Sequence, residues 1–115
     1  MAVPTLEATV REQNGLTVID LRGDIDARAE AALNDAYAQA DSRKPKAILL
    51  NFSQVEYINS TGIALIVGLL AKARQANIKL LTCGLTDHYI EIFQITRLSD
   101  FMNIYADEAS AVADL

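Results

Sequence analysis

Strand-like and helix-like patterns of apolar residues alternate along the chain, and the first pattern is that of a hairpin. Residues 6–10 and 16–21 are both rich in strand-forming residues, and Asn14-Gly15 lies between them. This dipeptide tolerates the positive φ angles of a tight turn between antiparallel strands. We therefore expect a β-hairpin at the start of the chain.

After the hairpin, apolar residues follow a helical period in some segments and form short unbroken runs in others. The helical period predicts helices over 27–40 and 60–75 and shorter ones after Thr86 and Asp107. A short apolar run predicts a buried strand over 47–52, followed by a loop over 53–58. Further strands are expected over 78–83, which Gly84 ends, and over 102–105. The order ββαβαβαβα predicts an α/β fold, with a mixed, mostly parallel sheet of about five strands and helices packed on it.

The composition is that of one ordinary globular domain. The chain has 115 residues, of which 51% are hydrophobic, and no internal repeat or low-complexity tract divides it. A single cysteine, Cys83, can form neither an intramolecular disulfide nor a thiolate metal site, and we expect it in the core. No glycine-rich phosphate loop is present. The sequence therefore predicts one domain over 1–115, without a metal or a cofactor.

The charge and hydropathy patterns narrow the choice of partners. Ten basic residues are scattered among fifteen acidic ones, whereas a nucleic-acid surface needs clustered Lys and Arg. The longest apolar stretch, 63–71, is nine residues long, and a membrane-spanning helix needs about 20. No signal-peptide core occurs over 1–13. We expect a cytoplasmic protein with protein or small-molecule partners, no nucleic acid and no membrane span.

The segment Asn59-Ser60-Thr61-Gly62 places hydroxyl groups at the start of the long predicted helix. The backbone amides there have no partner within the helix, and the helix dipole is positive, so an anion is favoured. Phosphorylation of Ser60 would therefore leave the fold intact while changing the surface. The alternative is that Asn59 or Ser60 only caps the helix, which is the commoner role of such residues.

The helix over 60–75 has two different sides. At 100° per residue, Ile63, Ile66, Leu69, Leu70 and Ala73 share one wide arc, which should face the sheet. The opposite side carries a stripe of mostly small residues: Ser60, Ala64, Gly68, Ala71 and Gln75. Two interpretations of the stripe stay open, a docking surface for another protein's helix and close packing inside this domain.

Three segments together resemble the STAS domain family. The strand and helix over 47–68 are similar to its signature region, in which a buried strand leads to Asp-Ser-Ser/Thr-Gly and an apolar helix. Gly23-Asp24-Ile25-Asp26 resembles the family's Gly-Glu-Leu/Ile-Asp, and Ile92-Phe93 with 95–98 resembles its Leu-Phe-x-x-x-Gly-Leu segment. The sequence differs from the family at Asn59, where Asp is usual, and at Thr96-Arg97, where a glycine is common.

The resemblance implies a binding switch of the anti-sigma factor antagonist type. In that branch, an anti-sigma factor that is also a serine-protein kinase of the GHKL type phosphorylates the serine of the motif, which corresponds to Ser60, with Thr61 as the secondary candidate. The unphosphorylated protein binds this kinase, and a protein phosphatase restores binding. The implied partner surface comprises Asp24, Asp26, Asn59, Ser60, Thr61, Gly62, Ala64, Leu65 and Gly68.

Other interpretations of the same residues stay open. Asp24 and Asp26 are at least as well placed to cap the first helix as to meet a partner. Because Asn59 lacks the usual charge, the chain could instead be a non-phosphorylated STAS scaffold, or an accessory subunit of a transporter or signalling assembly. A hydrolase using Ser60 has little support, since His88 is the only histidine and no Gly-x-Ser-x-Gly elbow occurs. The sequence does not fix the oligomeric state.

Overall fold

The computed structural model describes residues 5–114, which form five strands and four α-helices in the predicted order. The strands are β1 (Glu7–Gln13), β2 (Leu16–Ile25), β3 (Ala47–Ile58), β4 (Lys79–Cys83) and β5 (Asn103–Tyr105). The helices are α1 (Glu30–Asp41), α2 (Ser60–Gln75), α3 (Asp87–Ile95) and α4 (Glu108–Ala113), with 3₁₀ turns η1 (Ala27–Ala29) and η2 (Leu98–Asp100). The α/β fold class is confirmed.

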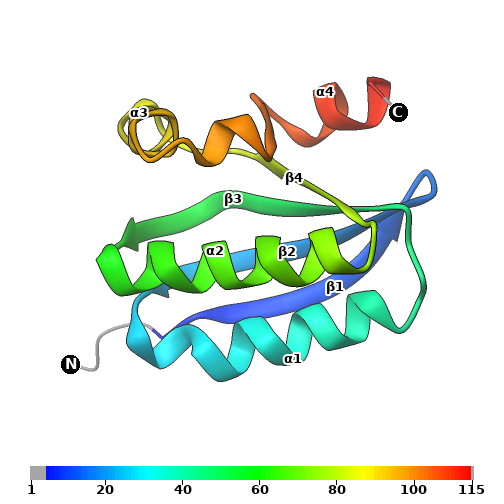
Figure 1. Cartoon of the computed structure of the whole chain (residues 1–115), viewed down its shortest axis with the longest axis horizontal. Coiled ribbons are helices and arrows are strands. Elements are labelled where there is room, and N and C mark those ends of the chain that lie inside the picture. The colour runs from blue at the N-terminus through cyan, green and yellow to red at the C-terminus, as the bar shows by residue number, and fades with distance from the viewer. Residues whose placement is uncertain (1–4, 115) are drawn as a thin grey trace.

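The strands form one mixed sheet in the order β1-β2-β3-β4-β5, with β1 antiparallel and the other strands parallel to their neighbours (Figure 1). The predicted hairpin is confirmed: β1 and β2 meet at Asn14 (φ 51°) and Gly15 (φ 81°). Two consecutive positive φ angles define the type I′ turn that suits the twist of paired strands.

The loop predicted over 53–58 is wrong, because β3 continues as a strand to Ile58. It is held by β2, which itself extends to Ile25, and the paired residues include Gly23 with Val55 and Ile25 with Ile58. Register shifts occur in this part of the ladder, and Val55 and Ile58 are buried. The segment contains several polar residues, so its sequence does not resemble a strand. Pairing with the neighbouring β2, rather than a local pattern, makes it a strand.

Helix caps agree with the predictions in part. Asp26 caps the η1 turn by accepting a hydrogen bond from the backbone N of Arg28, so regular helix begins at Glu30, three residues later than predicted. Asp107 caps α4 by accepting from the backbone N of Ser110 at 2.8 Å. Thr86 stands at the N-cap position of α3, but its side chain makes no capping bond.

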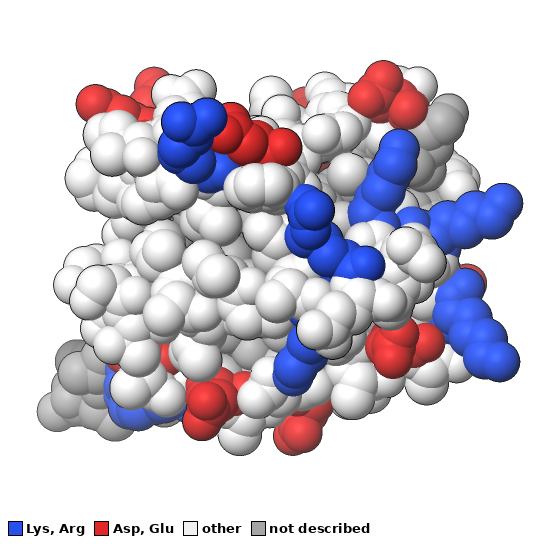
Figure 2. Space-filling view, in the orientation of Figure 1, with Lys and Arg blue, Asp and Glu red and all other residues white. Residues whose placement is uncertain are grey.

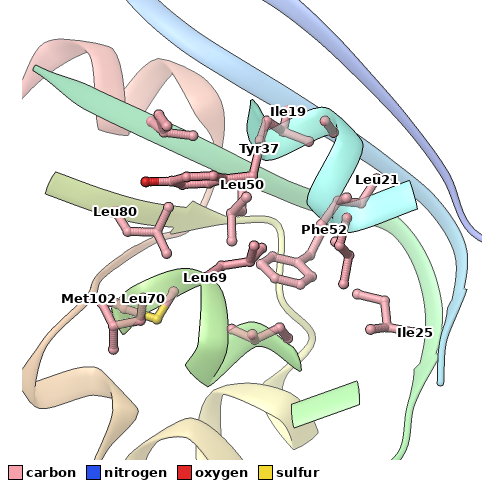
Figure 3. Packing of buried hydrophobic residues seen from close by; sticks show 14 of the residues in the cluster. Ile19, Leu21, Ile25, Tyr37, Leu50, Phe52, Leu69, Leu70, Leu80 and Met102 are labelled. Atoms are coloured by element: carbon pink, nitrogen blue, oxygen red, sulfur yellow. The ribbon is translucent and has the colours of Figure 1, made fainter. Parts of the chain in front are cut away.

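The main core lies between the sheet and the pair α1 and α2, which cover one face (Figure 1). In Figure 3, Leu69 from α2 meets Leu50 and Phe52 from β3, and Leu70 lies beside Met102. The ring of Phe93 from α3 packs edge-on against Phe52, with 6.1 Å between ring centroids. This packing fixes α2 and α3 beside the carboxyl end of β3.

The other face of the sheet carries a smaller apolar cluster covered by α4, together with an ion-pair network. The guanidinium of Arg11 donates to Asp20 Oδ2 at 2.5 Å and also to Glu108 of α4. These bonds from Arg11 are the main reason that the pKa of the Asp20 carboxyl lies below its ordinary value. Cys83 is buried here, as predicted, and burial raises the pKa of its thiol to about 11.

Candidate functional site

Hydrogen bonds fix the backbone where β3 ends and α2 begins. The backbone N of Ile58 donates to Tyr89 Oη at 2.9 Å, and the backbone N of Asn59 donates to the carbonyl O of Ile25 at 3.2 Å. Asn59 Oδ1 then accepts from the backbone N of Gly62 at 2.8 Å, which is the capping bond of α2. The residues on both sides of Ser60 are therefore held in place.

Ser60 and Thr61 occupy the first two positions of α2, and both are exposed. Their hydroxyls form no hydrogen bond with any part of the chain that the structure describes. Capping is done by Asn59, so the Ser60 hydroxyl is not needed for that role. The positive end of the helix dipole makes this position favourable for an added anionic group.

Gly62 brings the two sequence motifs into contact. A Cβ atom at this position would lie 2.1 Å from the carbonyl O of Ile25, so only glycine fits without a shift of backbone. The neighbouring Asp24 and Asp26 are half-buried, which places the Gly-Asp-Ile-Asp motif beside the start of α2. Asp26 forms a 2.7 Å ion pair with Arg28, which holds the pKa of that carboxyl below its usual range.

The outward side of α2 is uncharged over most of its length. Ala64, Gly68, Ala71 and Gln75 are exposed, whereas Leu65 is half-buried. A Cβ atom on Gly68 would meet nothing within 4 Å, so close packing inside the described domain does not explain this glycine. Figure 2 shows white surface over α2 and toward α3, without an acidic or basic side chain at its centre. The predicted inward arc is confirmed, since Ile66, Leu69, Leu70 and Ala73 are buried and Ile63, which is half-buried, packs against the core.

Two residues of the site were not predicted from the sequence. Tyr57 is 53% exposed, directly precedes the anchored Ile58 and pairs in register with Asp24. Tyr89 lies in the helix predicted after Thr86, and its hydroxyl accepts the hydrogen bond from the backbone N of Ile58. Tyr57 follows the polar Glu56 and precedes the apolar Ile58, a context that does not mark it as part of a site. Nothing local to Tyr89 could indicate a partner 31 residues away.

The remaining candidates are easily placed. His88 is exposed on α3, and its ring lies edge-on to that of Tyr89 with 4.9 Å between centroids. Over residues 5–114, no group of three or more His, Cys, Asp or Glu side chains is close enough to hold a metal ion. Among the helices that the structure describes, none is long and apolar enough to cross a membrane.

The chain belongs to the STAS domain family, whose pattern matches residues 7–111. Among curated proteins, it is 27% identical over 100 residues to the anti-sigma-B factor antagonist of Listeria monocytogenes, a match that covers 87% of each chain. It is also 30% identical over 77 residues to the anti-sigma-F factor antagonist RsfB of Mycobacterium tuberculosis, covering 66% of this chain and 63% of RsfB. The resemblance to the anti-sigma factor antagonist type is thus confirmed.

Solved structures support the same fold. An anti-sigma factor antagonist from Mycobacterium paratuberculosis superposes with a TM-score of 0.78 at 20% identity, covering 99% of this chain and 97% of that one. The Bacillus cell fate determinant SpoIIAA in its phosphorylated form gives a TM-score of 0.70 at 19% identity, covering 93% and 97%. At these identities, the likeness establishes the fold.

Proposed function

We propose that this protein is an anti-sigma factor antagonist controlled by phosphorylation of Ser60. In its unphosphorylated form, it binds a cytoplasmic anti-sigma factor that is also a serine-protein kinase of the GHKL type. Transfer of phosphate to Ser60 ends this binding, and a protein phosphatase restores it. The activity proposed for this chain is binding, not catalysis.

The observation that carries the proposal is the exposed, unbonded Ser60 hydroxyl beside a fixed and uncharged helix surface. Its relatives are named as antagonists of anti-sigma factors, and SpoIIAA was solved both with and without phosphate. A kinase needs a hydroxyl that it can reach, and a surface held in one conformation can be bound without a cost of ordering it. The start of α2 supplies both.

The switch follows from charge at this one position. A phosphate group carries about −1.5 to −2 charges at neutral pH. On Ser60, it would face the positive end of the α2 dipole, so the domain itself tolerates it. A partner that covers the uncharged side of α2 would instead have to bury that charge without a counter-charge, which is strongly unfavourable. Phosphorylation therefore changes the interface while the fold remains.

Asn59 is compatible with this mechanism. Its Oδ1 atom already makes the capping bond that a carboxylate would make, so the backbone of Ser60 is placed as an aspartate would place it. The difference is one missing negative charge beside the acceptor hydroxyl. Asn59→Asp should therefore leave the fold unchanged and alter only the rate at which the kinase modifies Ser60, rather than which residue is modified.

We place the partner surface around Ser60 and along the outward side of α2. It includes Thr61, Ala64, Leu65 and Gly68 of the helix, with Asp24 and Asp26 at its edge. Tyr57 extends it, because a half-exposed aromatic ring next to a small-residue surface is typical of residues that dominate binding energy. Tyr57→Ala should weaken partner binding without changing stability.

A binding comparison with three baits tests the proposal. Wild-type protein, Ser60→Ala and Ser60→Asp are immobilised, shown to be equally folded by circular dichroism, and exposed to lysate of the source organism. We expect a GHKL-type kinase to be retained by the first two and lost by the third. Phosphopeptide mapping after incubation with that kinase and ATP should place the phosphate on Ser60. Phosphate found only on Thr61 would overturn the assignment.

Retention of the same non-kinase partner by all three baits would contradict the switch. It would favour the second function, a STAS scaffold or accessory subunit, which the neutral Asn59 also permits. The two functions are therefore separated by one experiment, because only the switch requires that charge at Ser60 control binding.

A further inference from the structure

The end of the molecule opposite to Ser60 is basic. Although basic residues are scattered along the sequence, the fold brings several of them to the end where α1 and α2 finish and β3 and β4 begin. We call this group the basic end; its exposed members are Arg43, Lys44, Lys46, Arg74 and Lys79. Figure 2 shows blue side chains gathered at the right-hand end of the molecule, where Figure 1 shows these elements meeting.

The basic end carries more positive charge than local structure requires. Cations near helix C-termini are favoured by the helix dipole, which accounts for Arg74 in the last turn of α2. Lys46 and Lys79 have no such role, because they stand where β3 and β4 begin, joined by a 3.0 Å hydrogen bond from the backbone N of Lys79 to the carbonyl O of Lys46. Arg43 has only a loose ion pair with the exposed Glu12, at 3.4 Å.

A shallow pocket of about 250 Å³ opens beside these cations. Its floor consists of apolar side chains from α2, β4 and the residue between them, and Arg74 and Lys79 stand at its edge. Phe101, which is 54% exposed, forms one wall, and the Arg74 guanidinium stacks 4.8 Å from the centre of its ring. The pocket has room for one large apolar side chain, with positive charge next to it.

We propose that the basic end binds an acidic segment of a second protein, with one apolar side chain of that segment seated in the pocket. Carboxylates on either side of the anchored residue would face Lys46 and Lys79. Nucleic acid and anionic membrane fit less well, because the whole molecule carries a net charge of −5 and would be repelled by an extended polyanion. Asp41 and Glu12 also lie toward this end of the molecule. The charged residues that line the pocket are Arg74 and Lys79, so a short segment seated there meets positive charge.

This surface is independent of the proposed switch. Helix α2 has 16 residues and separates Ser60 from the basic end by about 24 Å, at 1.5 Å per residue. Charges this far apart at the surface are largely screened, since the Debye length at physiological salt is about 8 Å. Phosphorylation at Ser60 should therefore release one partner without releasing the other.

Titration of the ¹⁵N-labelled full chain with a synthetic peptide tests the proposal. The peptide carries glutamates on both sides of one central leucine, and a second peptide has serine in place of the leucine. The protein variants are Lys46→Gln with Lys79→Gln and, as a matched control at other positions, Arg22→Gln with Arg97→Gln. Ser60→Asp tests independence from the switch. Single-stranded DNA and phosphatidylserine vesicles are compared at the same near-physiological salt.

We expect amide shift changes at Lys79 and Phe101, with binding about fivefold weaker in the double lysine variant. Binding should be unchanged in the arginine control and in Ser60→Asp, and the serine peptide should bind less tightly. Absence of peptide binding, shift changes at the Ser60 end, or equal binding by the lysine variant would overturn the proposal. Tighter binding of DNA or of vesicles than of the peptide would also overturn it. None of these outcomes depends on whether Ser60 is a phosphorylation site.

Discussion

Two glycines of α2, six residues apart, occupy opposite environments. Gly62 is buried, and a Cβ atom there would lie 2.1 Å from the carbonyl O of Ile25. Gly68 is exposed, and a Cβ atom there would meet nothing within 4 Å. The first glycine is required by the contact between two motifs of the same chain. The second is not required by any contact in the described structure, although glycine weakens a helix relative to alanine by about 1 kcal/mol.

The difference distinguishes residues that fix the backbone at the start of α2 from residues that are exposed to a partner. Asn59 and Gly62 are held by contacts with backbone atoms. Ser60 and Gly68 are exposed, and the described structure gives neither the Ser60 hydroxyl nor a Cβ added at Gly68 such a contact. Residues of the first kind should affect stability when changed. Residues of the second kind should affect binding, and each of the following experiments tests one side of this division.

The largest expected effect is that of Gly62→Ala. The added methyl group must push the start of α2 away from the end of β2, and overpacking of this kind costs about 3 kcal/mol. Urea unfolding followed by circular dichroism measures the loss of stability. Gly68→Ala is the matched control in the same helix, and an equal loss in both variants would remove the distinction between the two glycines.

Tyr89→Phe should cost about 2 kcal/mol, because it leaves the buried backbone N–H of Ile58 without an acceptor. Thermal unfolding measures this change. Tyr57→Phe is the control, since the Tyr57 ring is half-exposed and should lose nothing in stability. If the two variants unfold at the same temperature as the wild type, the anchoring of the site by α3 is disproved.

Substitutions at Gly68 should affect the stability of the helix and the affinity for the partner in opposite directions. Gly68→Ala adds helix propensity on an exposed position and should stabilise the protein by about 1 kcal/mol. Gly68→Gln places a longer side chain on the outward side of α2 and should weaken partner binding about tenfold, because the partner can no longer approach closely. Ala38→Gln on the exposed side of α1 is the control; weaker binding in that variant too would argue against a specific surface on α2.

Acidification should lower the stability of the protein by weakening an ion pair on the face of the sheet that α4 covers. Arg11 keeps the pKa of the Asp20 carboxyl below its ordinary value, which is near 4. A lowered pKa means that this stabilisation is fully present above pH 4 and is lost as the pH falls through the pKa of the folded state. The Asp20 side chain is 31% exposed, so we expect only about 1 kcal/mol.

Unfolding of wild type and Asp20→Asn across this pH range measures the contribution. The variant should be less stable at neutral pH, and the two stabilities should converge in acid. Curves that stay parallel would show that Asp20 contributes nothing through its charge. Partner binding at neutral pH should be the same for both proteins, because Asp20 lies on the opposite face of the sheet from the main core and α2.

The elements with a strong local pattern could be predicted from the sequence. The periodic apolar residues of α2 predict its bounds, and the Asn14-Gly15 turn predicts the hairpin. The extension of β3 to Ile58 could not be predicted, because Ser53, Gln54 and Glu56 are polar and the strand depends on pairing with β2. The pattern of a segment predicts a helix or strand only when the residues of that segment, rather than its pairing with a distant segment, determine its structure.

The candidate site was predictable to a similar degree. A polar residue before an apolar helix predicts a cap, and Asn59 makes that bond. The contact of Gly62 with Ile25 and the bond from Ile58 to Tyr89 join distant parts of the chain, and only the fold brings them together. The basic end has the same origin, because its residues come from three separate segments.

The most direct test of the account is the affinity of the purified kinase for this protein with and without phosphate on Ser60. Isothermal titration compares the unphosphorylated protein, the stoichiometrically phosphorylated protein, and Ser60→Ala treated with kinase and ATP. The account predicts tight binding by the first and third and an affinity at least about 100-fold lower for the second, since an unpaired charge would be buried. Equal affinities for all three would contradict it.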